Sequence, residues 1–63
     1  MKNIFVAFMY KNSNGNWQYA NIIVLSEEIV DKNTFDILCN TIKLKHYLEK
    51  YQDVFVQNFQ YLN

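Results

Sequence analysis

Cys39 and His46 are the only cysteine and the only histidine of this chain, and together they could form a nucleophile and its base. Such a pair works only when the two groups lie within hydrogen-bond reach of each other. On one helix, their separation of seven positions corresponds to about 10 Å of rise, which is too long for that contact. We therefore expect a structural thiol and a surface or partly buried imidazole, and we predict no enzymatic activity.

Metal and phosphate sites need other patterns that the sequence lacks. The acidic group Glu27, Glu28 and Asp31 does not show the alternating spacing around a glycine that a Ca²⁺ loop requires. One cysteine and one histidine are too few ligands for a structural zinc site. Gly15 is the only glycine, so no glycine-rich loop can surround a phosphate. We predict neither a metal nor another cofactor.

Aromatic side chains are the remaining candidates, because Tyr10, Trp17 and Tyr19 could stack on the bases of a single-stranded nucleic acid. Proteins that do so surround the aromatic platform with Arg and Lys. This chain has no arginine, its six lysines balance six acidic residues, and only Lys11 and Lys2 lie near these aromatics. Nucleic-acid binding stays an alternative that the charge pattern argues against, and binding to protein is favoured.

The composition predicts one packed domain over residues 1–63, because 51% of the residues are hydrophobic and 17% aromatic. A domain of this length buries only about 60% of the surface that its unfolded chain exposes. Neither a disulfide nor zinc is available to add stability, so we expect a homodimer or a higher homo-oligomer. The apolar run Ile4 to Tyr10 is followed by KNSNGN without a signal-peptide cleavage site, which indicates a cytoplasmic protein with a reduced thiol and no membrane partner.

Two apolar runs, residues 3–10 and 17–25, flank KNSNGN and predict a β-hairpin. The pair Asn14-Gly15 is the strongest signal for a two-residue type I′ turn, which needs φ > 0 at both central residues. That turn pairs Tyr10 with Tyr19 and places Phe5, Ala7 and Met9 opposite Val24, Ile22 and Ala20. A slip of one residue would exchange these assignments.

A helix is predicted from Thr34 onward, capped by Asp31 or Asn33, with Asp36 in its first turn. Its core side chains recur at helical spacing: Phe35, Leu38, Cys39 and Ile42. Further along, the apolar residues fall on the opposite side: Leu44, Leu48 and Tyr51. The helix therefore either breaks between Lys43 and His46 or packs its second half against something else.

The run VFVQNFQYL, residues 54–62, predicts a third strand, although its pattern does not decide which of its sides faces the helix. The resulting fold class is α+β, with the order ββαβ. We expect a three-stranded antiparallel sheet in the order 2-1-3 with one helix packed on one face.

The helix is expected on the face that carries Ala7 and Ala20, since small residues let a helix approach a sheet closely. The opposite face would then hold Ile4, Val6, Phe8, Tyr10, Trp17, Tyr19, Asn21 and Ile23, with some of Phe55, Phe59 and Tyr61. An exposed apolar face of this size is typical of an interaction surface.

The sequence resembles very small proteins encoded by phages and mobile elements of Gram-positive bacteria. These proteins share a strand of the form F-V-x-[YF]-x-Y, a glycine-containing turn, an aromatic-x-x-N segment and a closing N-F-Q-x-L strand. The matching residues here are Phe5, Val6, Phe8, Tyr10, Gly15, Tyr19, Asn21, Asn58, Phe59, Gln60 and Leu62. Where the pattern usually reads G-F-G-N, this chain has Gln18-Tyr19-Ala20-Asn21.

The resemblance implies a small phage-type protein that acts in the cytoplasm of a host cell. Members that have been explained inhibit host enzymes or antiviral defence proteins by binding to them. The expected partner is thus a host protein, and the alternative is a purely self-associating domain. The candidate partner-binding residues are Phe8, Tyr10, Asn14, Trp17, Tyr19, Asn21, Tyr47, Tyr51, Phe59 and Tyr61.

Overall fold

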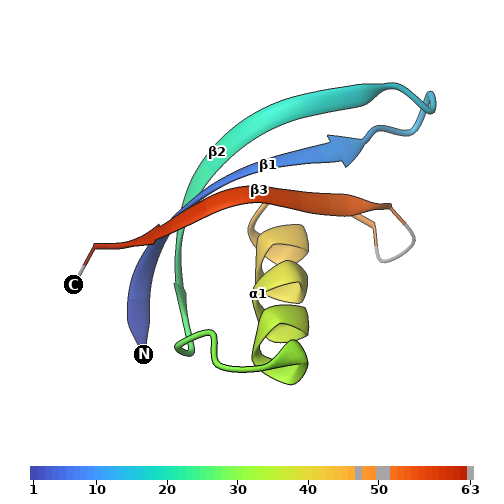
Figure 1. Ribbon diagram of the computed structural model, residues 1–63. Coiled ribbons are helices and arrows are strands. Elements are labelled where there is room, and N and C mark those ends of the chain that lie inside the picture. Colours follow the sequence, from blue (N-terminus) through green and yellow to red (C-terminus); the bar gives the residue numbers. More distant parts are fainter. Residues whose placement is uncertain (47, 50–51, 63) are drawn as a thin grey trace.

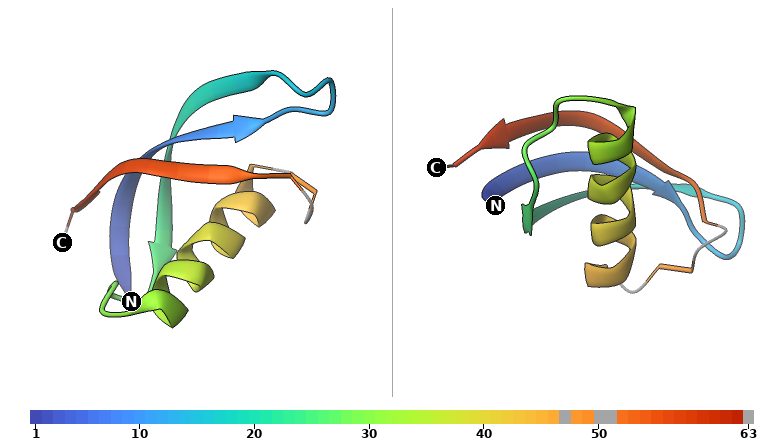
Figure 2. Two further views of the ribbon diagram at one scale, coloured as in Figure 1. Left: turned by 45° about the vertical axis from the view of Figure 1, so that its right-hand side comes forward. Right: turned by 90° about the horizontal axis from the view of Figure 1, so that it is seen from below.

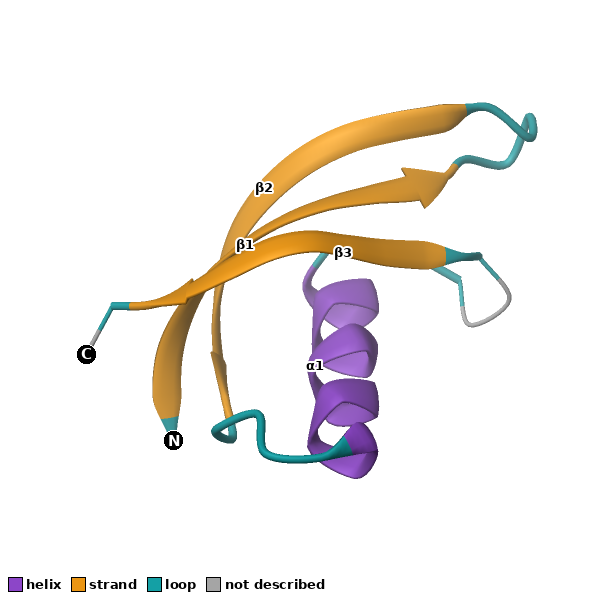
Figure 3. Ribbon diagram, in the orientation of Figure 1, coloured by secondary structure: helices purple, strands orange, loops and turns teal. Residues whose placement is uncertain are grey.

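A computed structural model describes residues 1–46, 48–49 and 52–62. Three strands, β1 (Lys2–Lys11), β2 (Trp17–Ser26) and β3 (Val54–Tyr61), form an antiparallel sheet in the order β2-β1-β3. The helix α1 (Lys32–Lys45) lies between β2 and β3 in the chain and packs on one face of the sheet (Figures 1 and 3). The predicted α+β fold, its ββαβ order and its 2-1-3 sheet are therefore confirmed.

The hairpin between β1 and β2 has a three-residue loop, not the predicted two-residue turn. The amide of Asn12 donates to the carbonyl of Asn16 at 2.8 Å, and the amide of Gly15 donates to the carbonyl of Asn12 at 3.0 Å. Gly15 adopts φ = 82°, the left-handed conformation that closes a type I turn with a bulge. The side-chain Oδ1 of Asn12 accepts the amides of Asn14 and Asn16 and stabilises the loop further.

The longer loop shifts the predicted register by one residue. Tyr10 pairs with Gln18, where the prediction paired it with Tyr19, and Val6 pairs with Ile22. Side chains alternate between the two faces along a strand. The shift therefore reverses which side chains of β1 share a face with a given side chain of β2. The prediction for β2 is correct, since Ala20, Ile22 and Val24 face the helix, and the prediction for β1 is wrong.

The helix therefore covers the face of β1 that was expected to be open. The core consists of six buried hydrophobic residues, which are Ile4, Val6, Phe8, Val24, Leu38 and Ile42. Phe35 and Cys39 are half-buried on the same side of α1, so the predicted apolar stripe of the helix is confirmed. Phe5, Ala7 and Met9, which were expected under the helix, point to the other side of the sheet.

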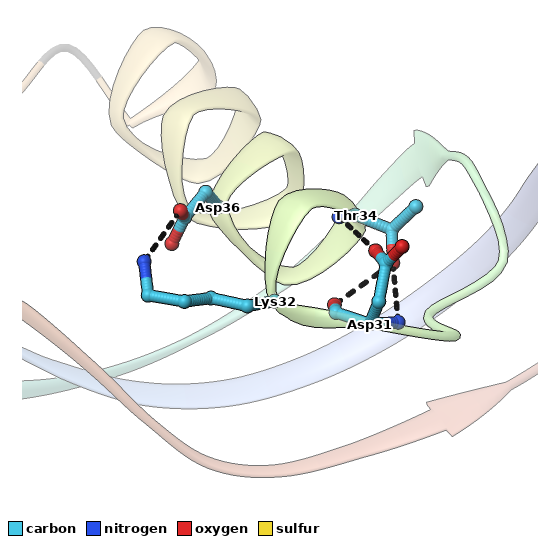
Figure 4. A network of polar contacts seen from close by, with 4 residues as sticks. All are labelled: Asp31, Lys32, Thr34 and Asp36. Atoms are coloured by element: carbon cyan, nitrogen blue, oxygen red, sulfur yellow. Dashed lines mark hydrogen bonds and ion pairs between the residues drawn. The ribbon is translucent and has the colours of Figure 1, made fainter.

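Asp31 caps α1 (Figure 4). Asn33 lies inside the helix. The carboxylate of Asp31 accepts the amide of Thr34 at 2.8 Å, and the hydroxyl of Thr34 accepts the amide of Asp31 at 3.1 Å. This reciprocal capping box satisfies two amides that a helix start leaves without partners. Asp36 lies beyond the first turn and pairs with Lys32 at 2.9 Å. The helix ends at Lys45 with His46 as its C-cap, which is the first of the two expected alternatives.

β3 pairs with β1 in two registers separated by an irregularity. Val6 pairs with Phe59 and Ala7 with Asn58, whereas Phe8 pairs with Val56, so Gln57 is an extra residue in β3. The hydroxyl of Tyr61 accepts the amide of Ile29 at 2.8 Å and ties the end of β3 to the segment before α1. The extra residue determines which β3 side chains face the helix.

The strands bend over α1, so the helix lies on the concave side of the sheet (Figures 1 and 2). Within the described residues, no second helix covers the convex side. We call this convex side the open face, and its strand residues follow from the alternation and the two registers. They are Asn3, Phe5, Ala7, Met9 and Lys11 of β1, Trp17, Tyr19, Asn21, Ile23 and Leu25 of β2, and Phe55, Gln57, Asn58 and Gln60 of β3.

Candidate functional site

The open face exposes large apolar side chains from both outer strands. The exposed fractions are 73% for Tyr19, 57% for Phe55, 55% for Leu25, 51% for Ile23 and 39% for Trp17. Phe5, Ala7 and Met9 are half-buried between them on the central strand. A monomeric soluble protein rarely exposes contiguous apolar surface on this scale unless the surface has a function. The open face is therefore the candidate functional site.

Aromatic rings gather at the hairpin end of the open face. The ring centroids of Trp17 and Phe55 lie 5.4 Å apart across the central strand, within the range of a favourable aromatic contact. The ammonium of Lys11 lies 5.8 Å from the centroid of Trp17, which is cation–π distance. The amide Nε2 of Gln57 donates to the sulfur of Met9 at 3.6 Å. These contacts bring large side chains together in one cluster on the open face.

The middle of the open face is small and polar. Ala7 pairs with Asn21 of β2 on one side and with Asn58 of β3 on the other. Both asparagines are exposed, and each amide offers two donors and one acceptor group. A partner can thus approach the backbone closely above Ala7 and form hydrogen bonds on both sides of it.

Both outer edges of the sheet carry features that oppose further strand pairing. On β2, the ammonium of Lys45 donates to the carbonyl of Ile23 at 2.6 Å and occupies an edge acceptor. On β3, the extra residue Gln57 interrupts the regular hydrogen-bond ladder. Lysine side chains and bulges are common ways to keep edge strands from pairing with other chains. The open face of the sheet is therefore a better contact site than its edges.

The predicted partner-binding residues fall into three groups. Trp17, Tyr19 and Asn21 lie on the open face, as expected, and Asn14 is exposed in the hairpin loop. Tyr47 and Tyr51 lie outside the described residues. The remaining four, Phe8, Tyr10, Phe59 and Tyr61, lie on the helix side.

Phe8, Tyr10, Phe59 and Tyr61 all belong to the helix side. Phe8 is fully buried, and Tyr10 and Phe59 are packed against the core. Tyr61 contacts the ring of Phe59 at 5.8 Å and accepts the amide of Ile29, so it is part of the structural frame. Phe8 and Tyr10 were misplaced by the predicted hairpin register, whereas the side of Phe59 and Tyr61 was left open, because β3 is apolar on both sides.

Eleven open-face residues were absent from the candidate partner-binding set, among them Met9, Ile23, Leu25, Phe55 and Asn58, although Ile23 and some of the β3 aromatic residues were already expected on the uncovered face. Ile23 and Leu25 could have been found by strand alternation, since they follow Tyr19 at every second position of β2. Phe55 could have been found by its position on β3, across the central strand from β2. For Met9 and Asn58, only the correct register identifies the side on which they lie. Sequence reasoning thus found the β2 part of the site and missed most of the rest.

His46 and Cys39 have positions that packing explains. The imidazole of His46 makes edge contacts with the rings of Phe8 and Tyr10, at centroid distances of 5.5 and 5.1 Å. Cys39 is half-buried on α1, and burial together with the charge of Asp36 raises the pKa of its thiol, partly offset by Lys43. A raised pKa disfavours the thiolate, which is the nucleophilic form.

Two further features of the described residues bear on function. A groove of about 400 Å³ on the outer side of α1 is lined by Asn40, Lys43, Leu44 and Leu48, and Leu44 is 80% exposed. No group of three or more His, Cys, Asp or Glu side chains within the described ranges could hold a metal ion. The described part of the chain also contains no helix with the length and apolar character needed to cross a membrane.

Comparison of the chain with protein-family models, with curated proteins and with solved structures finds no match.

Proposed function

We propose that this chain is a non-catalytic protein-binding domain whose main contact surface is the open face. The observation that carries the proposal is the exposure of Trp17, Tyr19, Ile23, Leu25 and Phe55 on one side of the sheet. Tyr, Trp and Phe are the residue types enriched at protein interfaces, where they combine large contact area with few rotatable bonds. Amides around them supply the polar contacts that such interfaces also contain.

We further propose that binding serves to occlude a host protein, as the resemblance to small phage-encoded proteins implies. The positions of Cys39 and His46 support a role by contact, since both side chains take part in packing. Beyond the open face, the hairpin loop and the groove beside Leu44 offer additional exposed surface. These two regions would contact the host protein if another molecule already covers the open face.

Affinity purification of the tagged chain from a low-GC bacterium tests this proposal. We expect one host protein in stoichiometric amount, and we expect Phe55→Asp to abolish its recovery. Val30→Asp is the matched control, because Val30 is 72% exposed and lies outside the open face, and the substitution introduces the same charge. Two results together would refute host inhibition. The first is that no host protein is recovered in stoichiometric amount, and the second is that expression of the chain leaves the phage sensitivity of strains with antiviral defence systems unchanged.

Single-stranded nucleic acid is the second candidate ligand, favoured by the neighbouring rings of Trp17 and Phe55 and by Lys11 beside them. Lys11 is the one charged side chain among the strand residues of the open face, which is a weak electrostatic footprint for a phosphate backbone. Titration of Trp17 fluorescence with oligonucleotides decides between the two candidates. Nucleic-acid binding requires quenching with a steep salt dependence, and the protein-binding proposal expects no quenching at low salt.

A further inference from the structure

We infer that the open face is the interface between two copies of this chain, joined about a two-fold axis. This inference rests on the proposed function, in which the open face is a protein contact surface, and it names a second copy as the protein there. The hairpin loop and the groove beside Leu44 are then left for the host protein. In such an isologous contact, the same surface of both copies meets itself and must be complementary to itself. The area, the charge distribution and the amide groups of the open face meet this requirement.

The exposed area matches what a stable dimer needs. A fully exposed aromatic side chain offers about 150–250 Å², so the five exposed apolar side chains together present on the order of 600 Å². The half-buried Phe5 and Met9 and the exposed amides of Asn21 and Asn58 add to this surface. A standard interface buries about 800 Å² on each partner, so the open face supplies most or all of one such surface.

The charge distribution allows two copies to meet. The chain has a formal net charge of zero, so two copies do not repel each other as whole molecules. Lys11 at the hairpin end is the only charged residue among the strand residues of the open face, and the ammonium of Lys45 lies at the β2 edge beside Ile23. A two-fold axis that crosses the strands near Ala7 places the two Lys11 side chains at opposite ends of the interface, far from each other.

The amides at the centre can pair with their own copies. An asparagine amide is both donor and acceptor, so Asn21 and Asn58 can each form hydrogen bonds with the same residue of a second copy. The small side chain of Ala7 between them lets the two convex surfaces approach most closely at the centre. Aromatic and aliphatic side chains on both sides of this row then exclude water, as in the core of two stacked sheets.

Pairing at a sheet edge is the other way in which this fold could dimerise, and the structure opposes it. Lys45 occupies the carbonyl of Ile23 on the β2 edge, and the bulge at Gln57 interrupts the β3 edge. The open face has no comparable protection. The second copy is therefore assigned to the face and not to an edge.

Sedimentation equilibrium of the full chain at micromolar concentration tests the inference. We expect a mass of twice 7.6 kDa, and we expect Phe55→Asp and Tyr19→Asp to raise the dimer dissociation constant about a hundredfold or more, since each buries an unpaired charge. Val30→Asp, which adds the same charge outside the open face, should leave the dimer intact. A wild-type mass of 7.6 kDa at every concentration overturns the inference, as does equal dissociation by Val30→Asp.

A nearly isosteric variant separates dissociation from unfolding. Asn58→Asp keeps the volume of the side chain and leaves a solvent-exposed carboxylate in the monomer, so the circular dichroism spectrum should not change. In the dimer it brings two carboxylates together across the axis, which disfavours their charged forms. We expect Asn58→Asp to be monomeric at neutral pH and dimeric again in mild acid, whereas a dimer at both pH values contradicts the assigned centre.

The same variants distinguish a failure of this inference from a failure of the proposed function. If the chain is monomeric and Phe55→Asp still abolishes recovery of the host protein, the open face binds that protein directly. The dimer is then wrong and the proposed function stands. If Phe55→Asp splits a dimer but recovery persists, the dimer stands and the contact surface for the host protein is wrong.

Discussion

Ser26 is the one buried polar side chain among the described residues whose oxygen has no hydrogen-bond partner there. It ends β2 on the helix side, opposite Lys2, and is 1% exposed. Burying a hydroxyl without a partner costs free energy, because the group loses its hydrogen bonds to water. Ser26 is thus a position where this small core is not optimal.

Replacing Ser26 by Ala should raise the free energy of unfolding by about 1 kcal/mol, because the unpaired hydroxyl disappears and the methyl group remains. Urea denaturation followed by circular dichroism measures the change. Ser13→Ala is the control, since Ser13 is exposed in the hairpin loop and is the only other serine. A destabilised Ser26→Ala variant would mean that the hydroxyl has a partner in solution.

Asp31 links helix capping to pH. The backbone amide of Thr34, together with its hydroxyl, donates to the carboxylate and lowers the pKa of Asp31. A pKa that is lower in the folded state adds stability that is complete above about pH 4 and is lost as the pH falls through the folded value. The capping box should therefore weaken only in acid.

The melting temperature of Asp31→Ala should lie about 4 °C below that of the wild type at neutral pH, because a helix cap is lost. This difference should shrink as the pH falls below about 4, where the wild-type carboxylate becomes protonated. Asp31→Asn should stay close to the wild type at neutral pH, since the amide oxygen still accepts the amide of Thr34. A difference that does not change with pH would count against the carboxylate as the cap.

At the scale of elements, the hairpin loop sets which side of β1 the helix covers. Gly15 holds the left-handed conformation that the three-residue loop needs, and a methyl group at this position would meet no atom within 4 Å. The effect of a substitution is thus purely conformational. An L-residue other than Asn or Asp is strained there by about 1–2 kcal/mol.

Gly15→Ala should lower the free energy of unfolding by about 1 kcal/mol, and Gly15→Asn should cost less, because asparagine tolerates the left-handed region better. Thermal unfolding of both variants measures the difference. Equal effects of Ala and Asn would indicate that the loop is not a type I turn closed by a left-handed residue.

For the whole molecule, the two faces of the sheet have different energetic roles. Six buried side chains hold α1 on the concave side, whereas the large side chains on the convex side remain exposed in a single copy. Phe8 and Phe55 represent the two sides with the same side chain. Their substitutions therefore separate the stability of the fold from the stability of the dimer.

Phe8→Ala should lower the free energy of unfolding by about 3–5 kcal/mol, which is enough to unfold much of a domain of this size. Phe55→Ala should leave a folded chain with far smaller loss at low protein concentration, because Phe55 is more than half exposed. Heteronuclear NMR spectra of both variants show which chain keeps dispersed resonances. Similar losses in the two variants would contradict the assignment of the two faces.

Dimerisation couples stability to concentration, because an associated state is favoured by mass action. The melting temperature of the wild-type chain should rise with protein concentration, and that of Tyr19→Asp should stay constant. Calorimetry over a range of concentrations measures both. A wild-type melting temperature independent of concentration would contradict the dimer at the whole-molecule scale.

The sequence by itself determined the elements, their order and the side of β2 that faces the helix. Local patterns are sufficient for these features: apolar residues at helical spacing from Phe35 to Ile42, a cap at Asp31 or Asn33, and a glycine between two apolar runs. In β2, the small Ala20 marks the side that a helix can approach closely, and Asn21 lies on the other side. Residues 17–25 therefore show which side is suited to the core.

Only the tertiary structure decided which side of β1 and β3 is covered, and hence which residues form the open face. β1 is apolar on both sides, with Phe8 on one and Phe5 on the other, so its pattern carries no preference. The choice depends on one residue of loop length at Gly15 and on one extra residue at Gln57. Each shifts a register by one position, and the packing of the whole sheet on α1 selects between registers whose local sequence signals are equal.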